Sequence, residues 1–420
     1  MARTLDQWLE KIEAEHPQSG IELGLGRMRT MLERLRLAFE VPVIIVGGTN
    51  GKGSTCFMLE AIYRAQGLKV ATHTSPHMLR FAERARFDGR EVDDETLAQA
   101  FEAVEAKRGG LSLTYFESTA LAILLAFQRL KPDVVVLEIG LGGRLDAINA
   151  IEPAASIVTS VGVEHETFLG TTREAIGWEK AHIFRPGRPA VVAEAHPPKK
   201  LLDYAEDIGA RLYVKDRDYA IEEAPGGVRF TFGNESFDLP RPALAGANQL
   251  DNAAGALAVV CALRETIPVT REAMARGLET VRIAGRFETV ARSPLTIIDV
   301  GHNPHAARVL VKNLADTPVA GRTIAVFGML KDKDMTEVIR TVGPEIDNWF
   351  VSGLPGPRGA SAQALTAAML EAGVARDAID VAEDITDAYE RAARFARPED
   401  KILIFGSFVA VTPLIERFHR

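Results

Sequence analysis

Residues 41–67 read VPVIIVGGTNGKGSTCFMLEAIYRAQG, in which an apolar run, a glycine-rich turn and a helical pattern follow one another. This order predicts a buried strand, a tight turn and a helix, which is the arrangement of a phosphate-binding loop. The usual spelling G-x-x-x-x-G-K-[ST] is not met, because only three residues part Gly47 from Gly51 and Gly53 separates Lys52 from Ser54. The stretch therefore encodes either a variant phosphate site or an ordinary turn.

The residue types in this turn favour a phosphate site. Glycines let backbone amides point at phosphate oxygens, and the helix that follows presents its positive N-terminal end to an anion. Lys52 adds a mobile charge, and Ser54 or Thr55 can reach a magnesium ion. The alternative is a tight strand-to-helix turn with an incidental lysine. The strand and helix on either side favour nucleotide binding.

The composition is that of an ordinary globular protein, with 420 residues, 47% hydrophobic and 25% charged. This length suits two or three domains. The net charge of -8 argues against a broad nucleic-acid surface, and the two distant cysteines indicate neither a disulfide framework nor a zinc site. No stretch approaches the roughly 18 unbroken apolar residues of a membrane span. We expect a cytoplasmic protein that binds neither nucleic acid nor membrane.

Strand-like and helical patterns alternate along most of the chain, which predicts parallel sheets covered by helices. A break near residues 284–293 separates two such series. We therefore predict an α/β protein with a parallel-sheet P-loop nucleotide-binding domain over residues 1–285 and a smaller Rossmann-like domain over residues 286–420. Shorter alternating runs between residues 211 and 240 predict a small antiparallel region attached to the first domain.

Several polar residues follow strand-like runs in the first domain. Ser75 lies after the second run, Glu138 ends the run PDVVVLEIG, and His165 follows a later run. The carboxyl ends of parallel strands meet at one edge of a sheet, so these residues should approach the phosphate loop. A polar loop, a buried salt bridge and a capped or solvated side chain are the respective alternatives. Lys180 lies fifteen positions after His165, on a predicted helix.

Two motifs of the second domain carry similar side chains. The stretch IIDVGHNPHA places Asp299 and His302 just after a strand, and Asn303 can cap the helix that begins at Pro304. Arg286, in GRFE at the domain junction, is a cation that can bridge to the phosphates of a nucleotide. A surface arginine is the alternative.

The loop spelling T-N-G-K-G-S, followed by these segments in the same order, resembles the Mur ligase superfamily and its folylpolyglutamate synthase and dihydrofolate synthase branch. The resemblance implies that ATP binds the loop residues Asn50, Gly51, Lys52, Gly53 and Ser54, together with Asn252, Arg286 and Asp299. It implies magnesium ligands at Ser54, Ser75, Glu138 and His165. It implies catalytic roles for Lys52, Lys180, Arg286 and His302, with Lys180 carbamylated.

The resemblance also implies a folate site. Thr114, Tyr115, Phe116 and Glu117 resemble the dihydropteroate-binding stretch of bifunctional members, and Arg144, Leu145 and Asp146 match a segment that helps to hold the pterin. This chain departs from the usual family spelling where it has Glu164 in place of aspartate, His182 in place of glycine and Asn248 in place of histidine. Gly26 likewise replaces a glutamate, and Gly301 replaces an alanine.

The implied chemistry is ATP-dependent amide formation with ATP and Mg²⁺ as cofactors. A carboxylate of dihydropteroate or of a reduced folate attacks the γ-phosphate, and the amine of L-glutamate displaces phosphate from the acyl phosphate. Thr114 to Glu117 favour a bifunctional enzyme, expected to be a monomer. A folylpolyglutamate synthase without the first activity, a ligase acting on a cell-wall precursor and a nucleotide-dependent switch protein are the alternatives.

Overall fold

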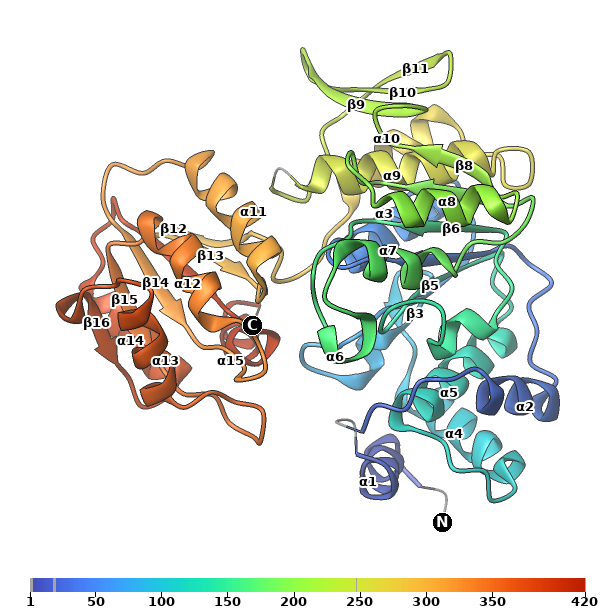
Figure 1. The fold of residues 1–420 in the computed structure, drawn as a ribbon, viewed down its shortest axis with the longest axis horizontal. Helices are drawn as coiled ribbons and strands as arrows, with labels where there is room; N and C mark the ends of the chain where they lie inside the picture. Colours follow the sequence, from blue (N-terminus) through green and yellow to red (C-terminus); the bar gives the residue numbers. More distant parts are fainter. Residues whose placement is uncertain (1–2, 18–19, 247, 420) are drawn as a thin grey trace. The chain divides into compact units, whose positions relative to one another are not determined.

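The computed structural model describes residues 3–17, 20–246 and 248–419. The chain divides into two compact units, which Figure 1 colours from blue to yellow and from orange to red. The first unit comprises Met1–Ala243 with Leu250–Val281, and the second comprises Leu244–Gln249 with Arg282–Arg420. The last of the three places where the chain passes between the units, after Val281, lies close to the predicted break near residues 284–293. The functional division at residue 285 stays a prediction.

An eight-stranded sheet in the order β4-β3-β2-β5-β1-β6-β7-β8 forms the centre of the first unit. The strands are β1 Val43–Gly47, β2 Val70–His73, β3 Ala85–Phe87, β4 Arg90–Glu91, β5 Val134–Glu138, β6 Ala155–Val158, β7 Pro189–Val192 and β8 Arg211–Val214. Strands β2, β5, β1, β6, β7 and β8 run parallel, while β3 and β4 add an antiparallel edge. Strands β1, β5, β6 and β7 are buried throughout, which explains why their sequences are almost continuously apolar.

Helices cover both faces of this sheet. They are α1 Leu5–Glu15, α2 Gly26–Leu35, α3 Lys52–Ala65, α4 Asp94–Arg108, α5 Tyr115–Leu130, α6 Glu166–Leu169, α7 Arg173–Ala181, α8 Lys199–Asp207, α9 Asn248–Ala262 and α10 Arg271–Thr280. Val43 and Ile45 of β1 share one apolar cluster with residues of α1, α4 and α5. On α3, Ile62 packs closely against Gly277 of α10, where an added Cβ would lie 2.6 Å from the Cα of Ile62. The phosphate loop is thus held between well-packed elements.

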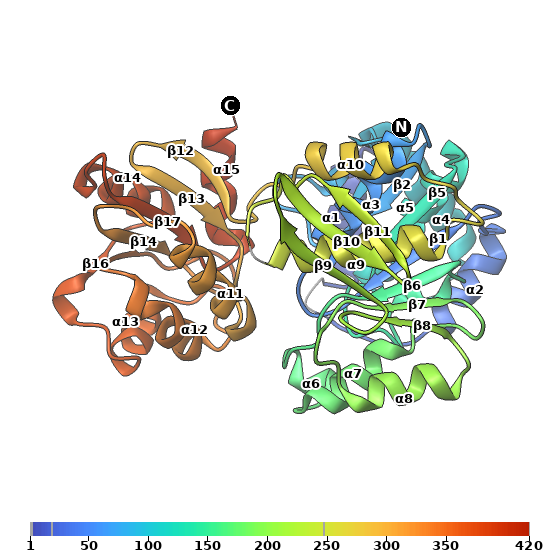
Figure 2. The same ribbon diagram turned by 90° about the horizontal axis from the view of Figure 1, so that it is seen from above.

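The predicted antiparallel region is confirmed over part of its range. Strands β9 Tyr219–Ala224, β10 Gly227–Phe232 and β11 Glu235–Leu239 form a separate three-stranded antiparallel sheet. Figure 2 shows these three strands side by side. The expectation that this region begins near residue 211 was wrong. Residues 211–214 are β8, which pairs in parallel with β7 and extends the large sheet.

The second unit has a six-stranded sheet in the order β12-β13-β17-β14-β15-β16. Its strands are β12 Glu288–Arg292, β13 Leu295–Asp299, β14 Thr323–Phe327, β15 Asn348–Val351, β16 Ile379–Val381 and β17 Lys401–Phe405. Its helices are α11 Pro304–Ala315, α12 Met335–Val342, α13 Ala362–Glu371, α14 Ile385–Phe395 and α15 Phe408–Phe418. All neighbouring strands are parallel except the edge pair β12 and β13. The predicted α/β class is therefore observed in both units.

Candidate active site

The phosphate loop joins β1 to α3 through residues 48–51. Gly51 precedes the helix with a φ of 88°, in the left-handed region that favours glycine, and no side chain caps the first turn. The amides at the start of this 14-residue helix are therefore open to an anion. This geometry fits the phosphates of a nucleotide, as residues 41–67 predict.

Two glycines let neighbouring side chains approach the loop closely. A Cβ added to Gly48 would lie 2.0 Å from Oγ1 of Thr159, and one added to Gly51 would lie 2.2 Å from Oδ1 of Asn252. Both distances are far below van der Waals contact, so no larger residue fits at either position. The structure thus places Asn252 of α9 directly against the loop, while its role at adenine stays a prediction.

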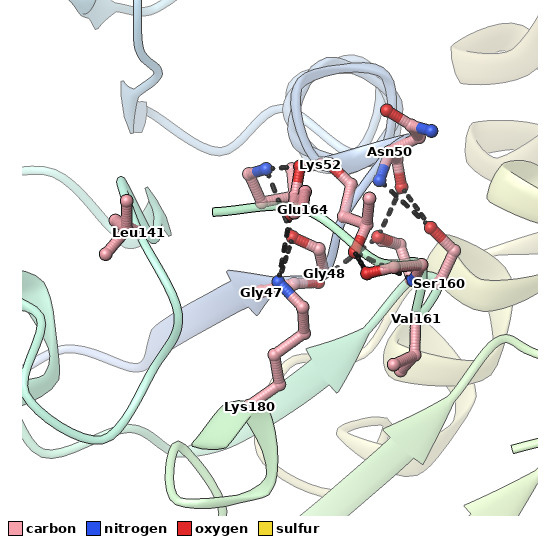
Figure 3. A network of polar contacts seen from close by, with 12 residues as sticks. Gly47, Gly48, Asn50, Lys52, Leu141, Ser160, Val161, Glu164 and Lys180 are labelled. Atoms are coloured by element: carbon pink, nitrogen blue, oxygen red, sulfur yellow. Dashed lines mark hydrogen bonds and ion pairs between the residues drawn. The ribbon is translucent and has the colours of Figure 1, made fainter. Parts of the chain in front are cut away.

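Two lysines converge on one carbonyl of the loop (Figure 3). Lys52 Nζ donates to the carbonyl oxygens of Gly48 at 3.1 Å and Thr49 at 3.0 Å. Lys180 Nζ, reaching in from α7, donates to the same Gly48 oxygen at 2.9 Å and to Glu164 Oε1 at 3.3 Å. The two catalytic lysines that the sequence suggests are thus brought together, although 128 positions separate them (180 minus 52).

Burial controls the ionisation of Lys180 and Glu164. Desolvation lowers the pKa of Lys180 to about 8, although the nearby Glu164 carboxylate favours the charged form of Lys180. Burial alone would raise the pKa of Glu164, but Lys180 and Lys52 together lower it to about 2. Glu164 is therefore an anion at neutral pH. Sequence reasoning noted Glu164 only as a departure from the family and missed this partnership.

The turn after β6 braces the phosphate loop from the other side. The N–H of Asn50 donates to Ser160 Oγ at 3.0 Å, and both Ser160 Oγ and Thr159 Oγ1 donate to the Asn50 carbonyl, at 3.0 and 2.7 Å. Thr49 Oγ1 adds a bond to the carbonyl oxygen of Gly162 at 3.2 Å. Sequence reasoning missed these hydroxyls. The available signal was the stretch TSVG directly after a strand-like run.

The structure brings together two of the four predicted magnesium ligands. Glu138 ends β5, and its Oε2 accepts the N–H of Ser75, after β2, at 2.9 Å. Ser54 lies in the first turn of α3, and His165 directly precedes α6. Over the described ranges, no three His, Cys, Asp or Glu side chains gather as a metal site. The oxygens of Ser54, Ser75 and Glu138 suit Mg²⁺, so the donor types fit while the ligand set stays a prediction.

The predicted dihydropteroate stretch begins helix α5. Thr114 Oγ1 caps this helix by accepting the N–H of Glu117 at 3.1 Å. In return, Glu117 Oε2 accepts the N–H of Thr114 at 2.9 Å. Both carboxylate oxygens of Glu117 also accept from Arg27 Nε, at 3.0 and 2.8 Å. Thr114 and Glu117 therefore shape the start of the helix.

The two aromatic residues of this stretch take different positions. The Tyr115 ring lies 5.9 Å from the guanidinium carbon of the buried Arg84. The Phe116 ring lies against Gly140, where an added Cβ would stand 2.7 Å from Phe116 Cζ. Phe116 thus borders the loop that follows β5, the segment predicted to hold the pterin.

That loop is stabilised by Asp146. Its two carboxylate oxygens accept the N–H groups of Leu141 at 2.8 Å and Ile148 at 2.9 Å. Asp146 is 2% exposed, and burial raises its pKa to about 6. The Leu145 carbonyl accepts the N–H of Gly24 at 3.1 Å, and Arg144 points to Glu179 of α7. The loop is therefore ordered by its own predicted substrate residues.

The predicted site residues of the second unit also lie close together. Asp299, at the end of β13, accepts the N–H groups of Phe287 at 2.9 Å and Gly301 at 2.6 Å, and burial raises its pKa although Arg286 opposes this. The Phe408 ring lies 5.4 Å from the Arg286 guanidinium carbon and 6.1 Å from the His302 ring. Phe408 carried no signal in the sequence, because it lies more than one hundred positions from its neighbours (408 minus 302 is 106).

Comparison with known proteins decides the family. Residues 46–260 match the Mur ligase middle domain, and residues 285–408 match the Mur ligase glutamate ligase domain. A dihydrofolate synthase/folylpolyglutamate synthase of Escherichia coli K12 is 39% identical, and the alignment covers 99% of this chain and 96% of that relative. The chain belongs to the dihydrofolate synthase/folylpolyglutamate synthase family of Mur ligases.

Solved structures of this family share the fold. Escherichia coli FolC in complex with DHPP and ADP aligns with a TM-score of 0.93 at 37% identity, covering 100% of this chain and 98% of that chain. A bifunctional folylpolyglutamate synthase/dihydrofolate synthase with Mn, AMPPNP and L-glutamate bound aligns with a TM-score of 0.92 at 40% identity, with the same coverage of 100% and 98%.

Membership of the dihydrofolate synthase/folylpolyglutamate synthase family confirms three expectations: the fold class, an ATP-dependent ligase, and ATP with a divalent metal as cofactors. The roles of individual residues stay predictions. No helix in the described part of the chain combines the length and apolar character that a membrane span requires.

Proposed function

We propose that this chain joins L-glutamate in amide linkage to dihydropteroate and to reduced folates, using ATP. One observation carries the proposal: Lys52 and Lys180 meet at the Gly48 carbonyl, beside the uncapped start of α3. A site for a nucleotide phosphate, the Lys52 ammonium and the Lys180 amine thus lie at one place. The relatives that carry both activities in their names support both substrates.

The reaction needs charge neutralisation more than a protein nucleophile. A substrate carboxylate attacks the γ-phosphate of ATP, ADP leaves, and the amine of L-glutamate then displaces phosphate from the acyl phosphate. The amides of α3 and the Lys52 ammonium stabilise the negative charge on the phosphates. Lys52 is suited to this role because its hydrogen-bond acceptors are neutral carbonyls rather than carboxylates.

Magnesium, when bound, supplies further neutralisation at the phosphates. Ser54, Ser75, Glu138 and His165 are the residues that would hold it. The contact between Ser75 and Glu138 supports the proposal, because it orients a carboxylate at the end of β5 beside a hydroxyl-bearing residue. Asn252 would contact adenine from its position against Gly51.

Lys180 would act as a carbamate. In this step the neutral amine attacks the carbon of carbon dioxide, an N–C bond forms as one C=O π bond opens onto its oxygen, and one proton passes from the nitrogen to water. The buried position of Lys180 and its lowered pKa, about 8, both increase the share of neutral amine. The carbamate would place a carboxylate-like group at the phosphate loop.

The remaining proposed roles divide between the two units. Phe116 and the loop around Asp146 would receive the pterin in the first unit, and Arg286, Asp299 and His302 of the second unit would act on the phosphates and on glutamate. The predicted domain boundary at residue 285 would separate these tasks. We further propose a monomeric cytoplasmic enzyme, consistent with two buried free cysteines and with a net charge of -8 that disfavours nucleic acid.

Phosphate release tests this function. Purified protein is supplied with magnesium, ATP and L-glutamate, and with dihydropteroate or tetrahydrofolate in separate reactions. The bifunctional enzyme requires L-glutamate with either pterin substrate. Release with tetrahydrofolate alone would leave a folylpolyglutamate synthase, and release indifferent to every co-substrate would indicate a nucleotide-dependent switch protein.

A further inference from the structure

The loop after β5 is tied to the last turn of α7, which carries Lys180. Arg144 Nε lies 3.1 and 3.2 Å from the two carboxylate oxygens of Glu179, and Nη2 donates to Oε1 at 3.0 Å. The backbone N–H of Arg144 also donates to the Glu179 carbonyl at 3.0 Å. Both the side chain and the backbone of Arg144 therefore hold the residue next to Lys180.

Backbone packing brings the loop against Lys180 itself. A Cβ added to Gly143 would lie 2.7 Å from the Glu179 carbonyl oxygen and 3.0 Å from Lys180 Cα. Asn149 Nδ2 spans the same junction by donating to the carbonyls of Arg144 at 3.3 Å and His182 at 3.2 Å. A displacement of the loop must therefore move the end of α7.

Aromatic rings fix the orientation of the Arg144 guanidinium. Its central carbon lies 5.2 Å from the Trp178 ring centroid, the Trp178 ring lies 4.2 Å from that of His182, and His182 stacks on Tyr204 of α8 at 4.0 Å. Glu179 accepts from Nε and Nη2 of the guanidinium, while its central carbon lies over the Trp178 ring. Only a planar, bidentate cation satisfies both partners, so lysine cannot replace arginine here.

The neighbouring members of the loop face other elements. Asp146 accepts two loop amides, and Gly140 lies against Phe116. One side of the loop thus borders the proposed pterin position, and the other borders the helix of Lys180. Lys180 in turn extends to the Gly48 carbonyl at 2.9 Å.

We propose that Arg144 and Glu179 are a positioning pair that keeps Lys180 aligned with the phosphate loop when the substrate loop is occupied. Arg144 acts through Glu179 rather than by touching the pterin. The inference rests on the proposed function, because it assigns the pair to that same site. An error of about 1 Å in the position of a catalytic group can cost on the order of a hundredfold in rate.

Three variants test the pair: Arg144→Gln, Glu179→Gln and the double variant. Initial rates give kcat and KM for dihydropteroate at saturating ATP and L-glutamate. We expect each single change to lower kcat about tenfold and to leave this KM within about twofold, because positioning is lost while pterin contacts remain. We expect the double variant to be no slower than the slower single variant, because both changes break one interaction.

A second set of variants distinguishes the effect of losing the Arg144–Glu179 contact from a general loss of stability. Glu152→Gln is the matched control, because Glu152 pairs with Arg185 at 3.0 Å near the same loop but is exposed, with 79% of its side chain accessible. It should leave kcat unchanged. The swapped pair, Arg144→Glu with Glu179→Arg, should regain part of the lost kcat, whereas Arg144→Lys should remain impaired.

Fluorescence reports the geometry without any reaction. Of the tryptophans, Trp178 is 38% exposed, whereas Trp8 and Trp349 are buried. Removal of the cation from its ring should increase quenching of Trp178 by acrylamide in the Arg144→Gln variant, with Trp178→Phe identifying the signal. Unchanged quenching would contradict the placement of the Arg144 guanidinium over the Trp178 ring.

The outcomes are distinguishable. If the unaltered protein shows no glutamate-dependent phosphate release, the proposed function fails. If that release is present, two results overturn the pair: an Arg144→Gln variant with a raised KM for dihydropteroate beside a fully active Glu179→Gln variant, or a double variant whose loss equals the product of the single losses.

Discussion

Lys180 Nζ and the carbonyl oxygen of Gly48 lie 2.9 Å apart, which joins the end of α7 to the turn after β1. Lys52 donates to the same oxygen at 3.1 Å. Two ammonium groups at one carbonyl repel each other, and the Glu164 carboxylate, 3.3 Å from Lys180, offsets part of this repulsion. One point of the loop thus holds Lys52, the charge proposed to neutralise the phosphates, and Lys180, the amine proposed to be carbamylated.

Replacement of Lys180 by methionine should abolish most of the ligase activity. Methionine keeps the buried volume but removes both the contact to Gly48 and the amine that would be carbamylated. We expect kcat to fall by on the order of a hundredfold or more, measured as glutamate-dependent phosphate release. Lys199→Met, at an exposed lysine of α8, is the control and should retain activity. A Lys180→Met enzyme with normal kcat would remove Lys180 from the mechanism.

Gly51→Ala should prevent nucleotide binding. The new Cβ would lie 2.2 Å from Asn252 Oδ1, at a φ of 88° that L-residues rarely adopt. Gly187→Ala imposes a similar left-handed strain, with φ at 66°, but meets nothing within 4 Å. Calorimetric titration with ADP should show binding to the Gly187 variant and none to the Gly51 variant. Equal affinities in the two variants would contradict the close approach of Asn252.

Ser160→Ala should weaken ATP binding while the fold is retained. The change removes the acceptor of the Asn50 N–H and one donor to the Asn50 carbonyl. Loss of these part-buried hydrogen bonds costs about 1–3 kcal/mol, which corresponds to an increase of roughly 5- to 150-fold in the KM for ATP. Ser361→Ala removes a helix cap in the second unit and should lower stability without changing this KM. An unchanged KM for ATP in the Ser160 variant would show that the Ser160–Asn50 hydrogen bonds are not needed for ATP binding.

Asp146 should make stability depend on pH. Its folded-state pKa, about 6, lies above the ordinary value of 3.8, so the folded protein holds the proton more tightly than the unfolded chain. Protonated Asp146 therefore contributes to the free energy of unfolding below pH 4. This contribution, about 3 kcal/mol, is lost as pH rises to about 6. Urea unfolding of the unaltered protein and of Asp146→Asn should show this loss only in the former. A free-energy difference that is constant across this range would refute the assignment.

The phosphate loop could be predicted from sequence because its signals are local. The apolar run of β1, the glycines and the start of α3 are contiguous, and Thr114 caps α5 through a residue three positions away. Glu138 was located for a similar reason, since it directly ends an apolar strand. These features depend on backbone geometry and periodicity, which a short stretch of sequence determines.

Contacts between distant segments could not be predicted in the same way. Arg144 meets Glu179 across 35 positions, and Asn50 meets Ser160 across 110 positions. Both contacts depend on which strands become neighbours in the sheet, and no local pattern encodes that order. Strand β8 was misplaced for the same reason, since its pairing with β7 is decided by the whole sheet.

Oxygen transfer tests the central claim most directly. Dihydropteroate carrying ¹⁸O in its carboxylate is converted with ATP, magnesium and L-glutamate, and the released phosphate is analysed by mass spectrometry. An acyl phosphate intermediate predicts one ¹⁸O atom in each phosphate formed together with the amide product. Amide formation with unlabelled phosphate would contradict carboxylate activation by ATP.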